Sequence, residues 1–149
     1  MNARDSVLAA QAAALAGLGW PGRPRWHLPA PVRTAAAAAL LAGGALALAG
    51  AVEQGRQLTP RIDPPDDARL LTSGVYRWSR HPVYAGLLVA GAGLAVLRRR
   101  PEPLAAWSAL AAVLHLKSGL EEQALRRRFG SAYDAYAART PRLLGRPAR

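Results

Sequence analysis

The 19-residue stretch Thr34–Val52, TAAAAALLAGGALALAGAV, contains no charged residue and decides the fold class. A helix needs about 20 apolar residues to cross the hydrocarbon core of a bilayer, so this stretch is nearly long enough to do so. Almost no polar face is available on it to meet water, which a core helix of a soluble bundle would require. The sequence therefore predicts a membrane-embedded helix here, with the soluble bundle as the alternative.

Three further apolar blocks cover Ser6–Trp20, Val83–Leu97 and Leu104–Leu116. The last two are joined by the tight connection RRRPEP, which predicts an antiparallel helical hairpin, although each is short for the roughly 30 Å of hydrocarbon. Small residues in the third block would let helix backbones approach closely; they are Ala85, Gly86, Ala90, Gly91 and Gly93. We expect an all-α integral membrane bundle of about four transmembrane helices, forming a single domain over residues 1–149. Whether residues 6–20 cross the bilayer is left open.

Two polar segments lie outside these blocks. Residues 59–67, TPRIDPPDD, are too rich in Pro and Asp for a helix and predict an irregular loop. Residues 121–142, EEQALRRRFGSAYDAYAARTPR, have apolar side chains at helical spacing and predict an amphipathic helix that Gly130 weakens or bends. This helix is too charged to cross a membrane, so we expect it in the cytoplasm or on the bilayer surface.

The charge of the chain is strongly positive, with 20 Lys and Arg against nine Asp and Glu. Such an excess suits nucleic acid, an anionic membrane surface or an acidic substrate. The cations lie between the apolar blocks and not across an amphipathic surface, which favours a membrane and argues against nucleic acid. With four spans, 14 cations share the side of the long loop and the tail and six lie opposite, so the positive-inside rule places the loop and tail in the cytoplasm, at a plasma or inner membrane. The chain has no cysteine, which excludes disulfides and zinc–thiolate sites, and we expect no metal.

The predicted hairpin brings two polar clusters to the same membrane face. The cluster at the start of the third block comprises Tyr76, Arg80, His81 and Tyr84. The cluster at the end of the fourth block comprises His115, Lys117, Glu121 and Glu122. Ionisable groups at the level of the membrane are candidates for function, and carboxylates beside imidazole, phenols and cations suit a polar ligand that carries both charges. On chemistry alone, a headgroup anchor beside a solvated acidic helix start is an equal alternative.

Two motifs in these clusters are similar to a known family. TSGVYRWSRHPVYAG at residues 72–86 is followed, after the hairpin, by EEQALRRRFGSAYDAY at 121–136 and TPR at 140–142. In this order and spacing they closely resemble the isoprenylcysteine carboxyl methyltransferase family. More distantly they resemble the membrane phospholipid methyltransferases, which share the RHPxYxG and EE elements. The likeness covers Ala68–Arg142, about half of the chain, and defines the motif-bearing core.

The resemblance implies S-adenosylmethionine as methyl donor, held on the cytoplasmic side, and a lipophilic acceptor that enters from the bilayer. The cofactor-binding residues that it implies are Ala68, Arg69, Leu70, Leu71, Tyr76, His81, Pro82, Val83, Tyr84, Glu121 and Glu122. The face of Tyr76 or Tyr84 can stabilise a sulfonium by cation–π attraction, and a carboxylate such as Glu121 can accept from ribose hydroxyls or an amino group. Which glutamate of the pair contacts the cofactor is left open.

The acceptor side is implied by one cationic position. In the prenylcysteine enzymes an Arg lies one helical turn before the first Glu of the pair and orients the acceptor carboxylate, and here that position is Lys117. Lys keeps the charge without the bidentate fork. The catalytic candidates are Lys117 and Arg80, with Arg139 and Arg142 as secondary candidates for the acceptor side. The leading acceptor is the carboxylate of a prenylcysteine-like substrate, and a phospholipid or a small lipophilic thiol or acid is the alternative acceptor. The alternative function for the whole chain is that of a non-catalytic membrane accessory protein.

Overall fold

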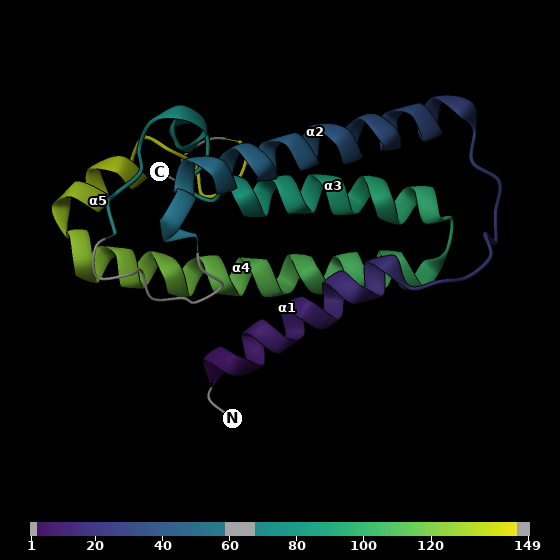
Figure 1. Ribbon diagram of the computed structural model, residues 1–149, viewed down its shortest axis with the longest axis horizontal. Helices are drawn as coiled ribbons and strands as arrows, with labels where there is room; N and C mark the ends of the chain where they lie inside the picture. The colour runs from purple at the N-terminus through teal and green to yellow at the C-terminus, as the bar shows by residue number, and fades with distance from the viewer. Residues whose placement is uncertain (1–2, 59–67, 146–149) are drawn as a thin grey trace.

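The computed structural model describes residues 3–58 and 68–145, and all regular structure in this part of the chain is helical (Figure 1). The predicted all-α fold is therefore confirmed. The elements in chain order are α1 (Ala3–Gly19), α2 (Ala30–Gln54), η1 (Gly55–Gln57), η2 (Gly74–Arg77), α3 (Pro82–Arg98), α4 (Pro101–Phe129) and α5 (Ser131–Ala137). The predicted irregular loop at 59–67 lies outside the described residues.

Proline residues fix where the long helices begin. Pro82 and Pro101 are the first residues of α3 and α4, and α2 has a proline in its first turn as well. Proline is favoured at a helix start because its missing N–H would have no intrahelical partner there. The apolar blocks predicted from the sequence thus become α1, α2, α3 and the first half of α4.

The fourth helix is longer than the sequence suggested. The block Leu104–Leu116 and the first part of the amphipathic segment form one continuous helix of 29 residues, α4. Gly119 does not interrupt it, because its neighbours are good helix formers and tertiary packing overrides a single unfavourable residue. Gly130 does interrupt it, with a φ of 52° that side chains rarely adopt, and α5 begins at the next residue. Gly130, predicted to weaken or bend the helix, in fact separates α4 from α5, whereas the separate start of an amphipathic helix at Glu121 is wrong.

One helix in the described part of the chain is long and apolar enough to cross a membrane, Ala30–Gln57, which comprises α2 and η1. Only 17% of the 18 residues in its most apolar stretch are buried within the protein, so most of these apolar side chains face outward. At 17 residues, α3 is apolar but falls short of the roughly 20 residues of a full span. The helix lengths thus support one span and do not confirm the four predicted.

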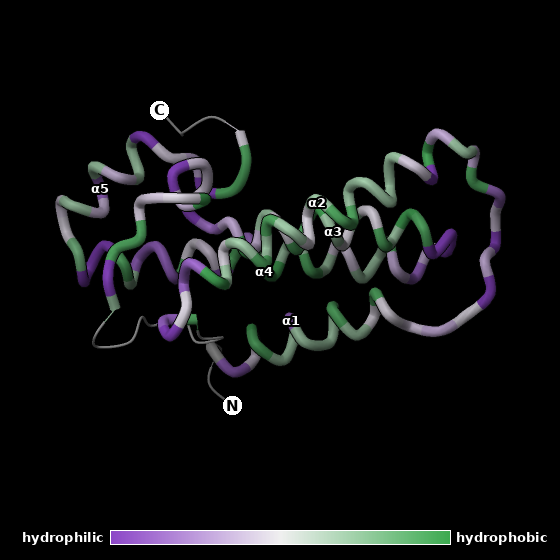
Figure 2. The backbone as a smooth tube through the Cα atoms, turned by 45° about the horizontal axis from the view of Figure 1, so that its top comes forward, coloured by the Kyte–Doolittle hydropathy of each residue, from purple (hydrophilic) through white to green (hydrophobic). Residues whose placement is uncertain are grey.

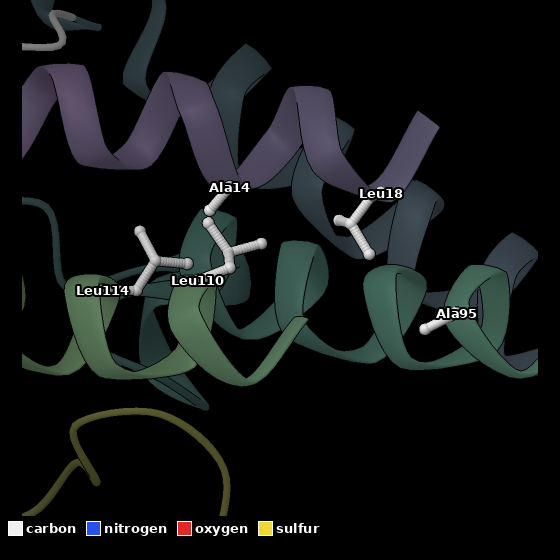
Figure 3. Packing of buried hydrophobic residues seen from close by; sticks show 5 residues of the cluster. All are labelled: Ala14, Leu18, Ala95, Leu110 and Leu114. Carbon is white, nitrogen blue, oxygen red and sulfur yellow. The ribbon is translucent and has the colours of Figure 1, made fainter. Parts of the chain in front are cut away.

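The helices pack in a fixed order. α2 lies along α3, α4 lies on the other side of α3, and α1 crosses α4 (Figure 1). Hydrophilic residues gather at the two ends of this bundle, around the α3–α4 turn and around α5 (Figure 2). Five buried side chains form the main apolar core (Figure 3); they are Ala14, Leu18, Ala95, Leu110 and Leu114.

The contact between α2 and α3 is made backbone to backbone. A Cβ atom added at Gly86 would lie 2.4 Å from the Ala47 nitrogen and 2.5 Å from the Gly43 oxygen. A Cβ atom added at Gly93 would lie 2.4 Å from the Ala36 oxygen. Close approach of helices through small residues, predicted from the third block, is therefore confirmed.

Two glycine-to-alanine substitutions with opposite expected effects on stability test this packing. Gly86→Ala should lower the free energy of unfolding by about 1–3 kcal/mol, because the added methyl overlaps backbone atoms that no rotamer change can move. Gly44→Ala is the matched control on α2, where an added Cβ has nothing within 4 Å. That variant should raise the free energy of unfolding by about 0.5–1 kcal/mol, the ordinary gain of Ala over Gly in a helix. Unfolding in detergent micelles measures both, and equal effects of the two variants would contradict the close packing.

Candidate functional site

The two predicted polar clusters meet at the end of the bundle where α3 begins and α4 passes beside it (Figure 1). Three of the four residues from the second cluster pair with residues from the first; they are Lys117, Glu121 and Glu122. His115 is exposed and stays outside, because it lies two residues before Lys117 and so faces away around the helix. The predicted convergence of the RHPVY and EE motifs is therefore a feature of the fold.

The RHP segment is held by the C-terminal TPR segment through backbone hydrogen bonds. The Arg80 nitrogen donates to the Pro141 oxygen at 2.9 Å, and the His81 nitrogen donates to the Arg142 oxygen at 3.1 Å. The buried Ser79 hydroxyl donates to the same Arg142 oxygen at 3.3 Å. Residues 140–142 thus line one side of the site. The sequence shows that this segment follows the two motifs, but it does not predict these hydrogen bonds.

Glu122 is the centre of the charged network. Its carboxylate accepts from Arg80 Nε at 2.9 Å and from Arg142 Nη2 at 2.8 Å, and its side chain is 1% exposed. His81 Nε2 lies 3.5 Å from the same carboxylate, longer than a strong hydrogen bond. Burial alone would raise the pKa of Glu122, but His81, Arg142 and the charge of Arg80 outweigh it and lower the pKa to about 2. Glu122 is therefore ionised and its oxygens are committed to two arginines.

Arg80 uses all of its nitrogens within the protein. Nε and Nη2 bind Glu122, and Nη1 donates to the backbone oxygens of Ala137 at 2.8 Å and Thr140 at 3.1 Å. The guanidinium thereby fastens the end of α5 to α4. This geometry shows a structural role for Arg80, and the catalytic role predicted from the sequence stays a prediction.

Glu121 has different neighbours from Glu122. Tyr84 donates its hydroxyl to Glu121 Oε1 at 2.6 Å, and His81 Nδ1 lies 3.5 Å from Oε2. The Glu121 side chain is 16% exposed and no arginine binds it among the described residues. Both oxygens of the second glutamate are thus bound by arginines, whereas the first glutamate is partly exposed and is bound by no arginine among the described residues.

His81 is held between the two carboxylates and stacks on Tyr84, with ring centroids 5.5 Å apart. Burial would lower the pKa of the His81 imidazole, but Glu121 and Glu122 together raise it, which favours the imidazolium. His81 Nε2 is buried and has no hydrogen-bond partner within residues 3–58 and 68–145. Its nearest acceptor is Glu122 Oε1 at 3.5 Å, so this nitrogen has an ion-pair neighbour but no hydrogen bond of ordinary length.

Lys117 lies on the α1 side of this group and is 1% exposed. Its Nζ donates to Gln11 Oε1 at 2.9 Å, lies 3.9 Å from Glu121 Oε1, and stands 5.3 Å from the centroid of the Tyr84 ring. Because Lys117 and Glu121 are one helical turn apart, both project from the same side of α4. Gln11 was not predicted as a site residue; its one signal in the sequence is an amide inside an otherwise apolar block.

The stretch before the TSG turn contacts the ends of other helices. Leu70 packs on a buried cluster of Tyr133, Tyr136 and Ala137, and the Arg69 nitrogen donates to Gln57 Oε1. Ala68 and Leu71 are partly buried. This predicted cofactor stretch therefore lies against α5 at one residue and against η1 at another.

Tyr76 is also tied to its surroundings. Its hydroxyl donates to the Gly50 oxygen at 3.3 Å and to Gln54 Oε1 at 3.1 Å, both on α2. Tyr136 donates to the Tyr76 backbone oxygen at 2.6 Å. The η2 turn that carries Tyr76 is thus fixed between α2 and α5.

Pro82 and Val83 pack on α2. A Cβ atom added at Gly50 would lie 3.0 Å from Val83 Cγ2 and 3.1 Å from Pro82 Cγ. Their side chains therefore support the start of α3 against α2, and their predicted contact with a cofactor stays a prediction. Arg139, a secondary candidate, is exposed and donates to the Ala135 oxygen of α5 at 3.1 Å.

Comparisons with known proteins agree with the motifs. A family model described as the isoprenylcysteine carboxyl methyltransferase (ICMT) family matches residues 36–127. Two curated rice proteins, from Oryza sativa subsp. indica and subsp. japonica, are each called "Probable protein-S-isoprenylcysteine O-methyltransferase". Each is 37% identical to this chain over 89 residues, which is 58% of this chain and 47% of the rice protein. The chain spans about half the length of these relatives, and α1 and α5 lie outside the family match.

Proposed function

Since the chain belongs to the isoprenylcysteine carboxyl methyltransferase family, we propose that it methylates the carboxylate of a lipophilic, prenylcysteine-like acceptor with S-adenosylmethionine as donor. The observation that carries this proposal is the buried Lys117 ammonium beside the partly exposed Glu121 carboxylate. A cation and an anion side by side suit an anionic acceptor next to a cationic donor. We place the enzyme in a membrane with this site toward the cytoplasm, in accord with the apolar α2 helix and the cation count.

The residues present fit the donor. His81 Nε2 makes no hydrogen bond of ordinary length among the described residues, its nearest acceptor being Glu122 at 3.5 Å, and Glu121 is a partly exposed acceptor fixed by Tyr84. These two groups, with Tyr84 and the backbone of residues 68–71 and 81–84, would hold the donor's polar parts. The Tyr84 ring already faces His81 and the Lys117 ammonium, so Tyr84 serves the donor through its hydroxyl, which fixes the Glu121 carboxylate. Bound S-adenosylmethionine supplies an electrophilic methyl group on a cationic sulfur.

The reaction needs positioning more than acid–base chemistry. An acceptor carboxylate oxygen forms the new O–CH₃ bond with its own electron pair, and the electrons of the S–CH₃ bond remain on sulfur. The carboxylate and the sulfonium are both neutralised, the products are an ester and S-adenosylhomocysteine, and no proton moves. Lys117 orients the carboxylate, and the network around Glu122 holds the RHP segment in place. Alignment of the reacting atoms is where an enzyme gains most in such a displacement.

The position of Lys117 favours an acid over an amine as acceptor. A protonated amine such as an ethanolamine headgroup would be repelled by a buried ammonium, because like charges interact strongly where the dielectric constant is low. An acidic acceptor is attracted by the same group. The phospholipid alternative is therefore the weaker one for this chain.

Titration with S-adenosylhomocysteine in detergent tests the proposal. His81→Ala and Glu121→Ala should each weaken binding by about 1–3 kcal/mol, the cost of leaving a polar ligand group without its partner. His115→Ala is the matched control, because His115 is exposed and lies outside the site, and it should leave the affinity unchanged. Wild-type protein that fails to bind, or binding that all three variants leave intact, would refute the proposed donor site.

A further inference from the structure

We propose that Gln11 on α1 is an acceptor-positioning residue that acts together with Lys117. In this proposal the Gln11 amide fixes the Lys117 ammonium and offers its own N–H groups to the acceptor carboxylate. The two side chains are called the Gln11–Lys117 pair below. The inference rests on the proposed function and names the part of the site that selects an acidic acceptor.

The first observation is how the Lys117 ammonium is partnered. An ammonium has three N–H donors. One is used on Gln11 Oε1 at 2.9 Å, while Glu121 Oε1 at 3.9 Å is beyond hydrogen-bond distance. The Tyr84 ring, 5.3 Å away, attracts the charge without accepting a hydrogen bond along a fixed direction. Lys117 therefore keeps two N–H donors for a further ligand.

The second observation concerns the amide of Gln11. Its oxygen accepts from Lys117, and its nitrogen has no hydrogen-bond partner in the part of the chain that the structure describes. The amide nitrogen carries two donors, and it belongs to the same group whose oxygen lies at the ammonium. A carboxylate beside the Gln11–Lys117 pair would then accept from a cation and from an amide, and a charge-assisted hydrogen bond is stronger than a neutral one.

A purely structural role explains the pair less well. A buried ammonium is stabilised most by a carboxylate, and Glu121 lies one turn away on the same helix, yet the hydrogen bond goes to a neutral amide on another helix. This arrangement leaves the positive charge of Lys117 only partly compensated. A partly compensated buried cation favours an anionic ligand.

Gln11 lies outside the segment that matches the family, whereas Lys117 lies inside it. The family match begins at residue 36, so α1, at Ala3–Gly19, is outside it. The cation belongs to the family segment, and the amide that fixes it comes from a helix beyond that segment. The acceptor preference of this chain can therefore be set by α1 without any change in the donor site.

Steady-state kinetics with a prenylcysteine-like acid acceptor test the pair. Gln11→Leu should raise the acceptor KM by about 10-fold, the equivalent of one hydrogen bond to a charged group, and leave the S-adenosylhomocysteine affinity unchanged. Gln11→Glu should raise KM further, because its carboxylate would bind Lys117 and repel the acid. Gln123→Leu is the matched control for the same substitution at an exposed position of α4, and it should change nothing.

Three outcomes separate the readings. If Gln11→Leu leaves the acceptor KM unchanged, Gln11 has no role in acceptor positioning. The same holds if the variant raises KM and lowers kcat and S-adenosylhomocysteine affinity to the same extent. In both cases, turnover by the wild-type protein still supports the proposed function. Wild-type protein that methylates no carboxylate acceptor would overturn the proposed function itself, and the pair with it. If Gln11→Leu does not fold, Gln11→Asn keeps the amide but withdraws it by one methylene, and it should also raise KM and leave donor affinity intact.

Discussion

Glu122→Gln should lower the free energy of unfolding by about 3–5 kcal/mol, the cost of breaking a buried ion pair by removing one partner. The carboxylate binds Arg80 and Arg142 and lies beside His81 while it is 1% exposed. The amide would leave the 9% exposed Arg80 guanidinium without a counter-charge, and one of its nitrogen donors would face guanidinium donors. Thermal and denaturant unfolding in detergent measure the loss.

Glu121→Gln is the control at the next position. It makes the same chemical change in a side chain that is 16% exposed and bound by no arginine in the described residues, so it should cost much less stability and instead weaken S-adenosylhomocysteine binding. A pH series adds a second measure. The pKa of Glu122 is lowered from 4.5 to about 2, so its contribution to stability is present above pH 4.5 and is lost as the pH falls toward 2. Glu122→Gln should lack this loss, and a larger destabilisation by Glu121→Gln than by Glu122→Gln would contradict the network.

Lys117→Met should cut methyl transfer to an acid acceptor by about 100-fold, because charge-assisted hydrogen bonds contribute more than neutral ones and alignment of the acceptor depends on them. Met fills a similar volume without charge, and replacing a buried ion by an apolar side chain is often tolerated by the fold. S-adenosylhomocysteine affinity should therefore stay nearly unchanged. Lys117→Arg should keep much of the activity, since its guanidinium matches a carboxylate in two places.

Turnover with a labelled donor gives the measurement. A panel of a prenylcysteine, a phosphatidylethanolamine and a lipophilic thiol shows whether the loss is confined to the acid. Loss of S-adenosylhomocysteine binding in Lys117→Met, with no effect on acceptor saturation, would remove Lys117 from the acceptor side.

The meeting of the two motifs could be predicted because it follows from local rules. A short apolar hairpin returns the chain to the end from which it left, so RHPVY and EE had to lie side by side. The one-turn spacing of Lys117 and Glu121 also follows from helix geometry alone. A close helix contact through the small residues of α3 was predictable for a similar reason, although the sequence did not name α2 as the partner.

What could not be predicted depends on distant partners. The sequence shows the charge of Arg80 but not its partners, which are Glu122 and the backbone oxygens of residues 137 and 140, more than 40 residues later. Gln11 lies 106 residues before Lys117, and no pattern in the sequence links them. The continuity of α4 was missed because a change from apolar to charged residues looked like a boundary, although nothing in the backbone required one there.

The pairing of residues 80 and 81 with residues 141 and 142 also orders events during synthesis. The RHP segment leaves the ribosome about 60 residues before the strip of chain that holds it. Until that strip emerges, Glu122 lacks Arg142 and the Arg80 side chain lacks the oxygens that fasten it. A nascent chain can therefore place α2 and α3 against each other early, yet the network around the proposed donor site is complete only once residue 142 has emerged. An incomplete chain, stalled before residue 142, should accordingly be inert toward the donor.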